Sequence, residues 1–219
     1  MHSLIINANE LNQLIQNKEQ TEEILLLDLS DRDTYEHGTI PSAVYLDYAT
    51  IVSGTPPFAH KLPAANKFSE SLAAVGYKSS MHIVAFDDEF GLKAARLYWT
   101  LRMAGIENFS LLNGGVNAWV ESGYAKVSVA PGSVSVAASE PLNLSWNSPY
   151  LATAEQIKNC LGNKDVFLWD ARSYGEWSGE ECYADRAGRI PGALHLEWKA
   201  FIDEKGRILA KEQLESVLH

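Results

Sequence analysis

Residues 24–43 read ILLLDLSDRDTYEHGTIPSA, an apolar run that ends in a carboxylate and leads through a polar stretch to an Ile-Pro step. A related passage returns at residues 166–193, which read VFLWDARSYGEWSGEECYADRAGRIPGA. Asp28 of the first passage aligns with Asp170 of the second. In both passages the apolar run has the composition of a buried strand, and the carboxylate stands where such a strand would end.

The two passages stay in step over their whole length. Tyr35 lies seven residues after the first carboxylate, and Trp177 lies seven residues after the second. Ile40-Pro41 corresponds to Ile190-Pro191, after eight additional residues in the second passage. Solenoid repeats have periods of only about 20–50 residues, and the distance between these passages is far longer. The sequence therefore predicts two homologous domains.

Further apolar runs alternate with segments of helical period on both sides of the first passage. The expected strands are residues 24–27, 82–86 and 109–112, and the expected helices are residues 9–16, 68–75 and 92–103. Strands that alternate with helices are typical of an α/β domain built around a mostly parallel sheet. We therefore expect a parallel sheet flanked by helices.

The chain changes character at residues 124–150, which contain three prolines and show no helical period. Thr153 and Gln156 then have the spacing of a capping box, which predicts the start of a helix. We expect a complete domain at residues 1–123, a linker at 124–150, and the N-terminal part of a second domain at 151–219.

Composition and charge narrow the function. Hydrophobic residues make up 46% and charged residues 21% of the 219 residues, as in folded globular proteins. The formal net charge of -10 disfavours nucleic acid and anionic membranes as partners. No apolar run reaches the roughly 18–20 residues of a membrane span, and we expect a cytoplasmic protein. Two cysteines and six scattered histidines predict neither a disulfide framework nor a metal site, and no cofactor is expected.

Several short motifs occur in a fixed order along the chain. In the first half they are the strand ending at Asp28, Gly38-Thr39-Ile40-Pro41, Phe86-Asp87-Asp88, Ala95-Arg96 and Leu112-Asn113-Gly114-Gly115. In the second half they are Trp169-Asp170-Ala171-Arg172, Trp177-Ser178-Gly179-Glu180, Gly188-Arg189-Ile190-Pro191-Gly192-Ala193 and Glu197-Trp198. In this order the motifs resemble those of tandem-domain rhodaneses, the bacterial thiosulfate sulfurtransferases, over nearly the whole chain.

The resemblance implies two rhodanese folds, of which only the second is catalytic. It also implies a cysteine in a short loop whose backbone N–H groups point inward at a helix N-terminus, where they stabilise a thiolate and a bound anion. The thiolate takes the outer sulfur of thiosulfate, a small anionic donor, releases sulfite, and passes the sulfur to cyanide or a thiol. The alternative donor is 3-mercaptopyruvate.

Neither cysteine of the chain matches the catalytic position that the resemblance implies. In the first copy that position is Asp87, and in the second copy it is expected beyond His219. We interpret Cys160 as a buried structural thiol. Cys182 follows two glutamates, which disfavour a thiolate. These 219 residues alone are therefore predicted to be inactive.

Three arginines are candidates for binding the anionic donor: Arg172, Arg186 and Arg189. Arg172 could instead pair with a nearby carboxylate as a structural brace, and the sequence does not separate the two roles. Some relatives carry a donor-binding arginine where this chain has Glu176. This difference favours thiosulfate over mercaptopyruvate.

Two classes of function remain open at this stage. One is an enzyme of the thiosulfate sulfurtransferase family whose catalytic loop lies outside these residues. The other is a non-catalytic rhodanese-like module that binds or regulates a partner. A related Cys-dependent phosphatase is excluded, because the sequence has no Cys-x5-Arg loop. A partial second domain would expose strand edges, so we expect either a remaining C-terminal fragment or a homodimer through that domain to cover it.

Overall fold

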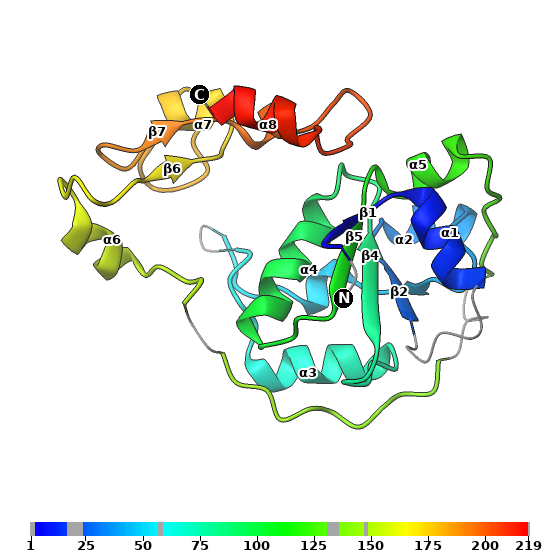
Figure 1. The fold of residues 1–219 in the computed structure, drawn as a ribbon. Coiled ribbons are helices and arrows are strands. Elements are labelled where there is room, and N and C mark those ends of the chain that lie inside the picture. Colours follow the sequence, from blue (N-terminus) through cyan, green and yellow to red (C-terminus); the bar gives the residue numbers. More distant parts are fainter. Residues whose placement is uncertain (1–2, 17–23, 57–58, 131–135, 147–148, 219) are drawn as a thin grey trace.

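The computed structural model describes residues 3–16, 24–56, 59–130, 136–146 and 149–218. Figure 1 shows two parts joined by an extended connection. We call the described residues of 3–123 the first unit and residues 151–218 the second unit. The first unit contains a five-stranded sheet, and the second contains a two-stranded sheet.

The sheet of the first unit is entirely parallel. Its strands are β1 (Ile5–Ile6), β2 (Ile24–Asp28), β3 (Val44–Tyr45), β4 (His82–Phe86) and β5 (Phe109–Leu112). They lie in the order β1-β5-β4-β2-β3. The helices between the strands are α1 (Ala8–Gln16), α2 (Arg32–His37), η1 (Tyr48–Thr50), α3 (Ala65–Ala74) and α4 (Leu92–Met103), and α5 (Gly115–Glu121) follows β5. The predicted parallel sheet with flanking helices is confirmed.

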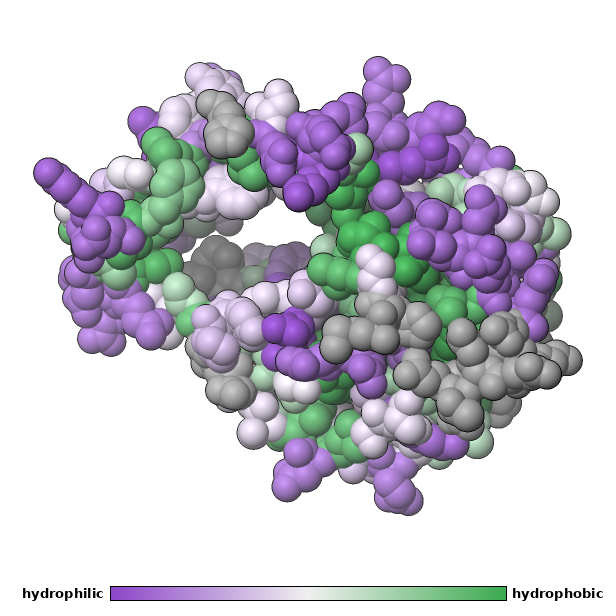
Figure 2. All heavy atoms as spheres, in the orientation of Figure 1, coloured by the Kyte–Doolittle hydropathy of each residue, from purple (hydrophilic) through white to green (hydrophobic). Residues whose placement is uncertain are grey.

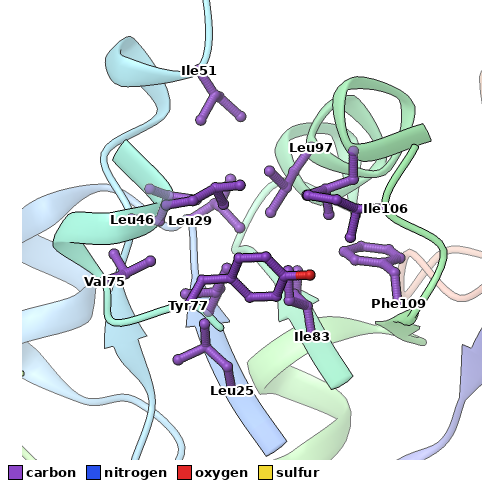
Figure 3. Close-up of a cluster of buried hydrophobic side chains, with 14 of the residues drawn as sticks. Leu25, Leu29, Leu46, Ile51, Val75, Tyr77, Ile83, Leu97, Ile106 and Phe109 are labelled. Carbon is purple, nitrogen blue, oxygen red and sulfur yellow. The ribbon is translucent and has the colours of Figure 1, made fainter. Parts of the chain in front are cut away.

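The central strand β2 is buried on both faces. Leu25 and Leu27 pack with residues of α3 and α4 in one apolar cluster, which Figure 3 shows in close-up. Leu26 points to the opposite face and packs with residues of α1 and α5 in a second cluster. Burial of each leucine side chain contributes about 1.5–3 kcal/mol. The unbroken apolar run of this strand therefore follows from its coverage on both sides.

The second unit repeats part of this architecture. Its elements are α6 (Ala154–Cys160), β6 (Trp169–Asp170), α7 (Tyr174–Ser178), β7 (Leu194–His195), η2 (Trp198–Phe201) and α8 (Lys211–Leu218). The predicted capping box forms at its start, where Thr153 Oγ1 accepts the backbone N–H of Gln156 and the Gln156 side chain accepts that of Thr153.

The sequence repeat is also a repeat of strand register. In the first unit Asp28 pairs with Tyr45, and in the second Asp170 pairs with His195, both in parallel. A short helix lies between the paired strands in each unit, α2 or α7, and a 3-10 helix follows the second strand. The two passages that were aligned by sequence thus fold into the same strand–helix–strand arrangement.

The predicted buried strand at 166–169 is wrong in both extent and burial. Strand β6 begins only at Trp169, which is 49% exposed, and Phe167 is 73% exposed. In the first unit β4 pairs with the other edge of β2, and helices cover both faces of the sheet. Among the residues that the structure describes, no strand pairs with the other edge of β6. The apolar run alone does not make a buried strand without such partners.

The segment predicted as a linker lies along the first unit. Its described residues form only one isolated bridge, between Thr39 and Val127. Ser69 Oγ donates to the carbonyl of Leu142 at 2.6 Å. The Trp146 ring lies 5.6 Å from that of Phe68. These contacts hold the connection against α3, while the domain boundaries themselves stay a prediction.

Candidate functional site

The carboxyl ends of β2 and β4 meet at one edge of the sheet, because the two strands are parallel neighbours. Ligands of open α/β sheets bind outside this edge. Asp28 is 1% exposed there and accepts hydrogen bonds from the Ser30 N–H at 2.8 Å and the Thr39 hydroxyl at 2.5 Å. Burial raises the pKa of Asp28 despite these bonds. Its side chain fixes the turn after the strand.

Asp87 directly follows β4 and turns its carboxylate back into its own loop. The carboxylate accepts three backbone N–H groups, those of Glu89, Gly91 and Ala94, each at 2.8 Å. The side chain is buried, and burial raises the pKa of Asp87 even though all three bonds favour the charged form. Three converging N–H groups at a helix N-terminus form an anion-binding arrangement. Here the chain's own carboxylate fills it.

Further acidic side chains surround this loop. Lys93 Nζ lies 2.8 Å from Asp31, 2.9 Å from Glu89 and 4.0 Å from Asp88. Burial alone would lower the pKa of Lys93, but the carboxylates of Asp31 and Glu89 raise it above its usual value. The lysine is therefore charged and committed to these acids, and it is not a free cation for an anionic ligand.

Arg172 is held as a brace in the second unit. Its Nε and Nη2 donate to the two oxygens of Asp170 at 2.8 and 2.6 Å, and Nη2 also reaches the Gly188 carbonyl at 3.0 Å. The bond from Arg172 lowers the pKa of Asp170 and keeps it ionised. These contacts are those of the structural brace, while a role of Arg172 in donor binding stays a prediction.

The three candidate arginines line a single cavity of ≈ 580 Å³ beside β6. Arg186 is exposed to solvent. Arg189 stacks on Trp177, with its guanidinium carbon 4.0 Å from the ring centroid. The rest of the lining is largely apolar and includes Ile157, Leu168 and Ile190. The structure thus brings the three predicted arginines together. Asp170 pairs with Arg172, so the positive charge of the lining comes from Arg186 and Arg189.

Neither thiol lies in that lining. Cys160 ends α6 and donates to the Gln156 carbonyl at 2.8 Å; it is partly exposed, so the expectation of a buried thiol is wrong. The reason is that α6 is weakly covered, since none of its residues is buried. Cys182 is exposed, and its thiol donates to the Ala184 carbonyl at 2.8 Å.

Comparison with known proteins identifies the fold. The profile of the rhodanese-like domain matches residues 7–122. This chain belongs to the rhodanese family. Thiosulfate sulfurtransferase of Pseudomonas aeruginosa is 32% identical over 196 residues, which are 90% of this chain and 71% of that protein. Thiosulfate sulfurtransferase of Azotobacter vinelandii is 32% identical over 181 residues, 83% of this chain and 65% of that protein.

More distant rhodanese relatives include proteins with other names. The 3-mercaptopyruvate sulfurtransferase of Escherichia coli is 26% identical over 84% of this chain and 64% of its own length. Among solved structures, SseA from Escherichia coli superposes with a TM-score of 0.81 at 24% identity, over 99% of this chain and 82% of that one. The chain therefore spans about two thirds of the length of the curated relatives it matches.

The sequence analysis did not predict an aromatic cluster that lies next to Arg189 in the second unit. The ring of Trp177 lies 5.1 Å from His195, and Tyr174 lies 5.6 Å from Trp177 and 5.9 Å from His195. A signal was available, because the repeat aligns Trp177 and His195 with Tyr35 and Tyr45, whose ring centroids lie 5.3 Å apart in the first unit. The cluster fixes α7 against β7.

The expected absences of a metal site and of a membrane span stay predictions. Within the described ranges of this rhodanese, no group of three or more His, Cys, Asp or Glu residues is placed to hold a metal ion. Over the same ranges, no helix combines the length and the apolar composition needed to cross a bilayer. The cytoplasmic location is likewise an expectation from the sequence.

Proposed function

We propose that the protein takes part in sulfur transfer from thiosulfate, with a first unit that is a non-catalytic scaffold. The observation that carries this proposal is the carboxylate of Asp87, which occupies the three loop N–H groups where a catalytic rhodanese would present a thiolate and bind its donor. The names of the Pseudomonas and Azotobacter relatives support thiosulfate as the donor. A tandem arrangement is supported by the repeated strand register.

The reaction proposed for the full-length protein has two balanced steps. A cysteine thiolate attacks the outer sulfur of thiosulfate, so that a new S–S bond forms to the protein and the old S–S bond breaks to release sulfite. Cyanide or an acceptor thiolate then attacks the terminal sulfur of the persulfide. This second step regenerates the thiolate and releases thiocyanate or a new persulfide. No external oxidant or reductant is consumed with cyanide as acceptor.

We propose that these 219 residues do not supply the nucleophile. The loop of Asp87 contains no cysteine, and the thiol of Cys182 is exposed and donates to a carbonyl rather than accepting from N–H groups. Cys160 donates in the same way to its own helix. Turnover in the proposed reaction therefore requires a cysteine loop that these residues do not contain.

The charges around the cavity favour thiosulfate as the donor over 3-mercaptopyruvate, which is the alternative donor. Arg186 and Arg189 are proposed to attract the small anion, and Arg172 to brace the loop between them and β6. Glu176 lies 3.9 Å from Arg172 and adds a negative charge on the side where a mercaptopyruvate carboxylate would need a cation.

Sulfur transfer is expected to be absent from the isolated 219-residue chain. The chain is incubated with thiosulfate, after which released sulfite, the protein-bound sulfur (by intact mass) and thiocyanate formed with cyanide are measured. The Pseudomonas aeruginosa thiosulfate sulfurtransferase serves as the positive control, and Cys160→Ser and Cys182→Ser serve as matched variants. We expect no product above the rate of the cysteine-free double variant.

One result would directly contradict the prediction that the chain is inactive, namely a persulfide on the wild type that disappears in Cys182→Ser.

The same protein samples test the donor site without turnover. Calorimetric titration with thiosulfate at low ionic strength is expected to show weaker binding to Arg186→Ala than to the wild type, and equal binding would remove Arg186 from the site.

The alternative function, a non-catalytic binding module, is favoured by the open edge of β6. Trp169 and Leu194 are 49% and 57% exposed, and Phe167 beside them is 73% exposed. In the first unit the corresponding edge of β2 carries the parallel strand β4 over five residue pairs. We propose that a strand from a remaining C-terminal fragment, or from a second copy of the chain, covers the edge of β6.

Sedimentation of the purified chain is expected to show a species heavier than 24.2 kDa, or a second fragment retained with it. The reason is that an exposed strand edge with large apolar side chains pairs readily with another strand. Denaturing mass spectrometry distinguishes the fragment from the homodimer. A monodisperse monomer with low binding of an apolar-surface dye would overturn this proposal.

A further inference from the structure

A hairpin at residues 202–208 projects from the second unit toward the first. Ile202 and Ile208 form an antiparallel bridge, and the Asp203 N–H donates to the Arg207 carbonyl at 2.8 Å. The Asp203 carboxylate accepts the N–H groups of Lys205 and Arg207 at 2.9 Å each. The tip of the hairpin is therefore shaped by its own bonds, independently of the first unit.

The first contact of this hairpin is to Asn113, which directly follows β5. Asn113 Oδ1 accepts the N–H of Ile208 at 2.7 Å, and its Nδ2 donates to the Ile208 carbonyl at 3.5 Å. The amide side chain thus pairs with one residue of the hairpin as a neighbouring strand would. This contact joins residues 95 positions apart in the sequence.

The second contact is steric and requires a glycine. Gly206 is buried at the tip of the hairpin with φ +72, against Phe90 of the loop between β4 and α4. A Cβ atom at this position would lie 2.4 Å from Phe90 Cδ1 and 3.2 Å from Phe90 Cα. The backbone of the hairpin therefore lies directly on this loop, in a space that a side chain would fill.

The third contact is between charges. Glu121, the last residue of α5, pairs with Lys205 at 3.0 Å and with Arg207. These groups are partly exposed, so each pair contributes little stability. The attraction between the two cations of the hairpin and this one carboxylate nevertheless determines which surfaces of the two units meet. Salt screens the attraction and will weaken this preference.

Asn113 directly follows β5 and Phe90 lies in the loop after β4, so both lie at the edge where α/β sheets bind ligands; Glu121 ends the following helix, α5. We propose that this edge of the first unit is a docking socket for the hairpin of the second unit and sets the orientation of the two units. Because Asp87 already fills the anion position of the edge, the socket is free for this use. The inference does not depend on the sulfur chemistry.

The connecting segment makes its own contact with the first unit. Tyr150 receives hydrogen bonds from Trp99 Nε1 at its carbonyl, at 3.1 Å, and from Arg102 at its hydroxyl, at 2.6 Å. Figure 2 shows open space between the units on the face in view. Loss of the hairpin contact is therefore expected to loosen the second unit, while Tyr150 still holds the connecting segment to the first unit.

Charge reversal at Glu121 tests the socket from outside the hairpin. In the full chain we expect Glu121→Lys to speed hydrogen exchange of the Ile208 amide by about fivefold and to enlarge the radius of gyration in small-angle scattering. The Asp203 amide, bonded within the hairpin, is expected to stay protected. Combining Glu121→Lys with Arg207→Glu should restore most of the protection. Glu70→Lys, which breaks the surface pair with Lys67, is the control for charge reversal elsewhere.

A second pair of variants tests the steric contact. Gly206→Ala and Gly162→Ala both place a side chain at positive φ in the second unit, but only Gly206 has an atom within 4 Å of the added carbon. Undocking is expected in Gly206→Ala and not in Gly162→Ala. The proposal is overturned if Ile208 exchange and the scattering curve are unchanged in both Glu121→Lys and Gly206→Ala. It is also overturned if Glu70→Lys changes them equally.

Discussion

Replacing Asp87 with alanine is expected to lower the free energy of unfolding by about 3–5 kcal/mol. The substitution removes the acceptor of three backbone N–H groups and leaves them facing a buried space. A buried donor without a partner costs about 1–3 kcal/mol, and water that enters the space recovers part of that cost. Urea unfolding followed by circular dichroism measures the loss.

Two further variants separate the loop bonds from the mere loss of a carboxylate. Asp87→Asn keeps Oδ1 as the acceptor for the N–H groups of Glu89 and Gly91 but turns an NH2 donor toward the N–H of Ala94. Its free energy of unfolding should therefore lie between those of the wild type and Asp87→Ala. Asp47→Ala removes an exposed carboxylate that caps a single N–H, that of Ala49 at 2.9 Å, and should cost about 1 kcal/mol. Equal losses for Asp87→Ala and Asp47→Ala would show that the loop N–H groups do not depend on Asp87.

The central part of the sheet was predictable because its signal is local. The apolar runs at 24–27, 82–86 and 109–112 each became strands, since an unbroken apolar run predicts a strand that is covered on both faces. The two-residue strands β1 and β3 gave no such signal, because two residues show no periodicity. The repeat added long-range information by predicting two homologous domains, and the structure shows that the second unit copies the strand register of the first.

The second unit shows where such reasoning fails. The run at 166–169 has the composition of a buried strand, yet only Trp169 belongs to β6, and it is half exposed. An apolar composition predicts that a segment is buried when the strands and helices that cover it are present. The described residues hold no counterpart of β4 beside β6. A prediction of burial is therefore a prediction about several elements at once.

The sequence predicted which residues belong to the candidate site but not the contacts that these residues make. The position of Asp87 followed from the motif order, but its three N–H bonds depend on the path of the loop into α4. Arg172 could be named from the sequence as a cation, whereas its bidentate pairing with Asp170 required the turn geometry. The contact of Asn113 with Ile208 had no sequence signal, because it depends on where the second unit lies.

Gly115→Ala is expected to be the most damaging of the glycine substitutions in the first unit, with a loss of about 3–5 kcal/mol in unfolding free energy. Gly115 begins α5 with φ +58, and a Cβ atom there would lie 2.4 Å from the backbone carbonyl oxygen of Asp87. A backbone atom cannot rotate away as a side chain can, so the loop of Asp87 and the start of α5 would have to separate. That separation would strain both the N–H groups around Asp87 and the socket residue Asn113.

Gly123→Ala is the matched control, because Gly123 follows the other end of the same helix at φ +88 with no atom within 4 Å of the added carbon. It should cost only about 1–2 kcal/mol, the strain of a non-glycine residue at positive φ. The difference between the two variants in urea unfolding isolates the contact with Asp87. If both variants lose the same stability, backbone strain alone explains the loss and the close approach has no energetic role. If Gly115→Ala also speeds exchange of the Ile208 amide while Gly123→Ala does not, the packing of α5 against the Asp87 loop supports the docking socket as well as the fold.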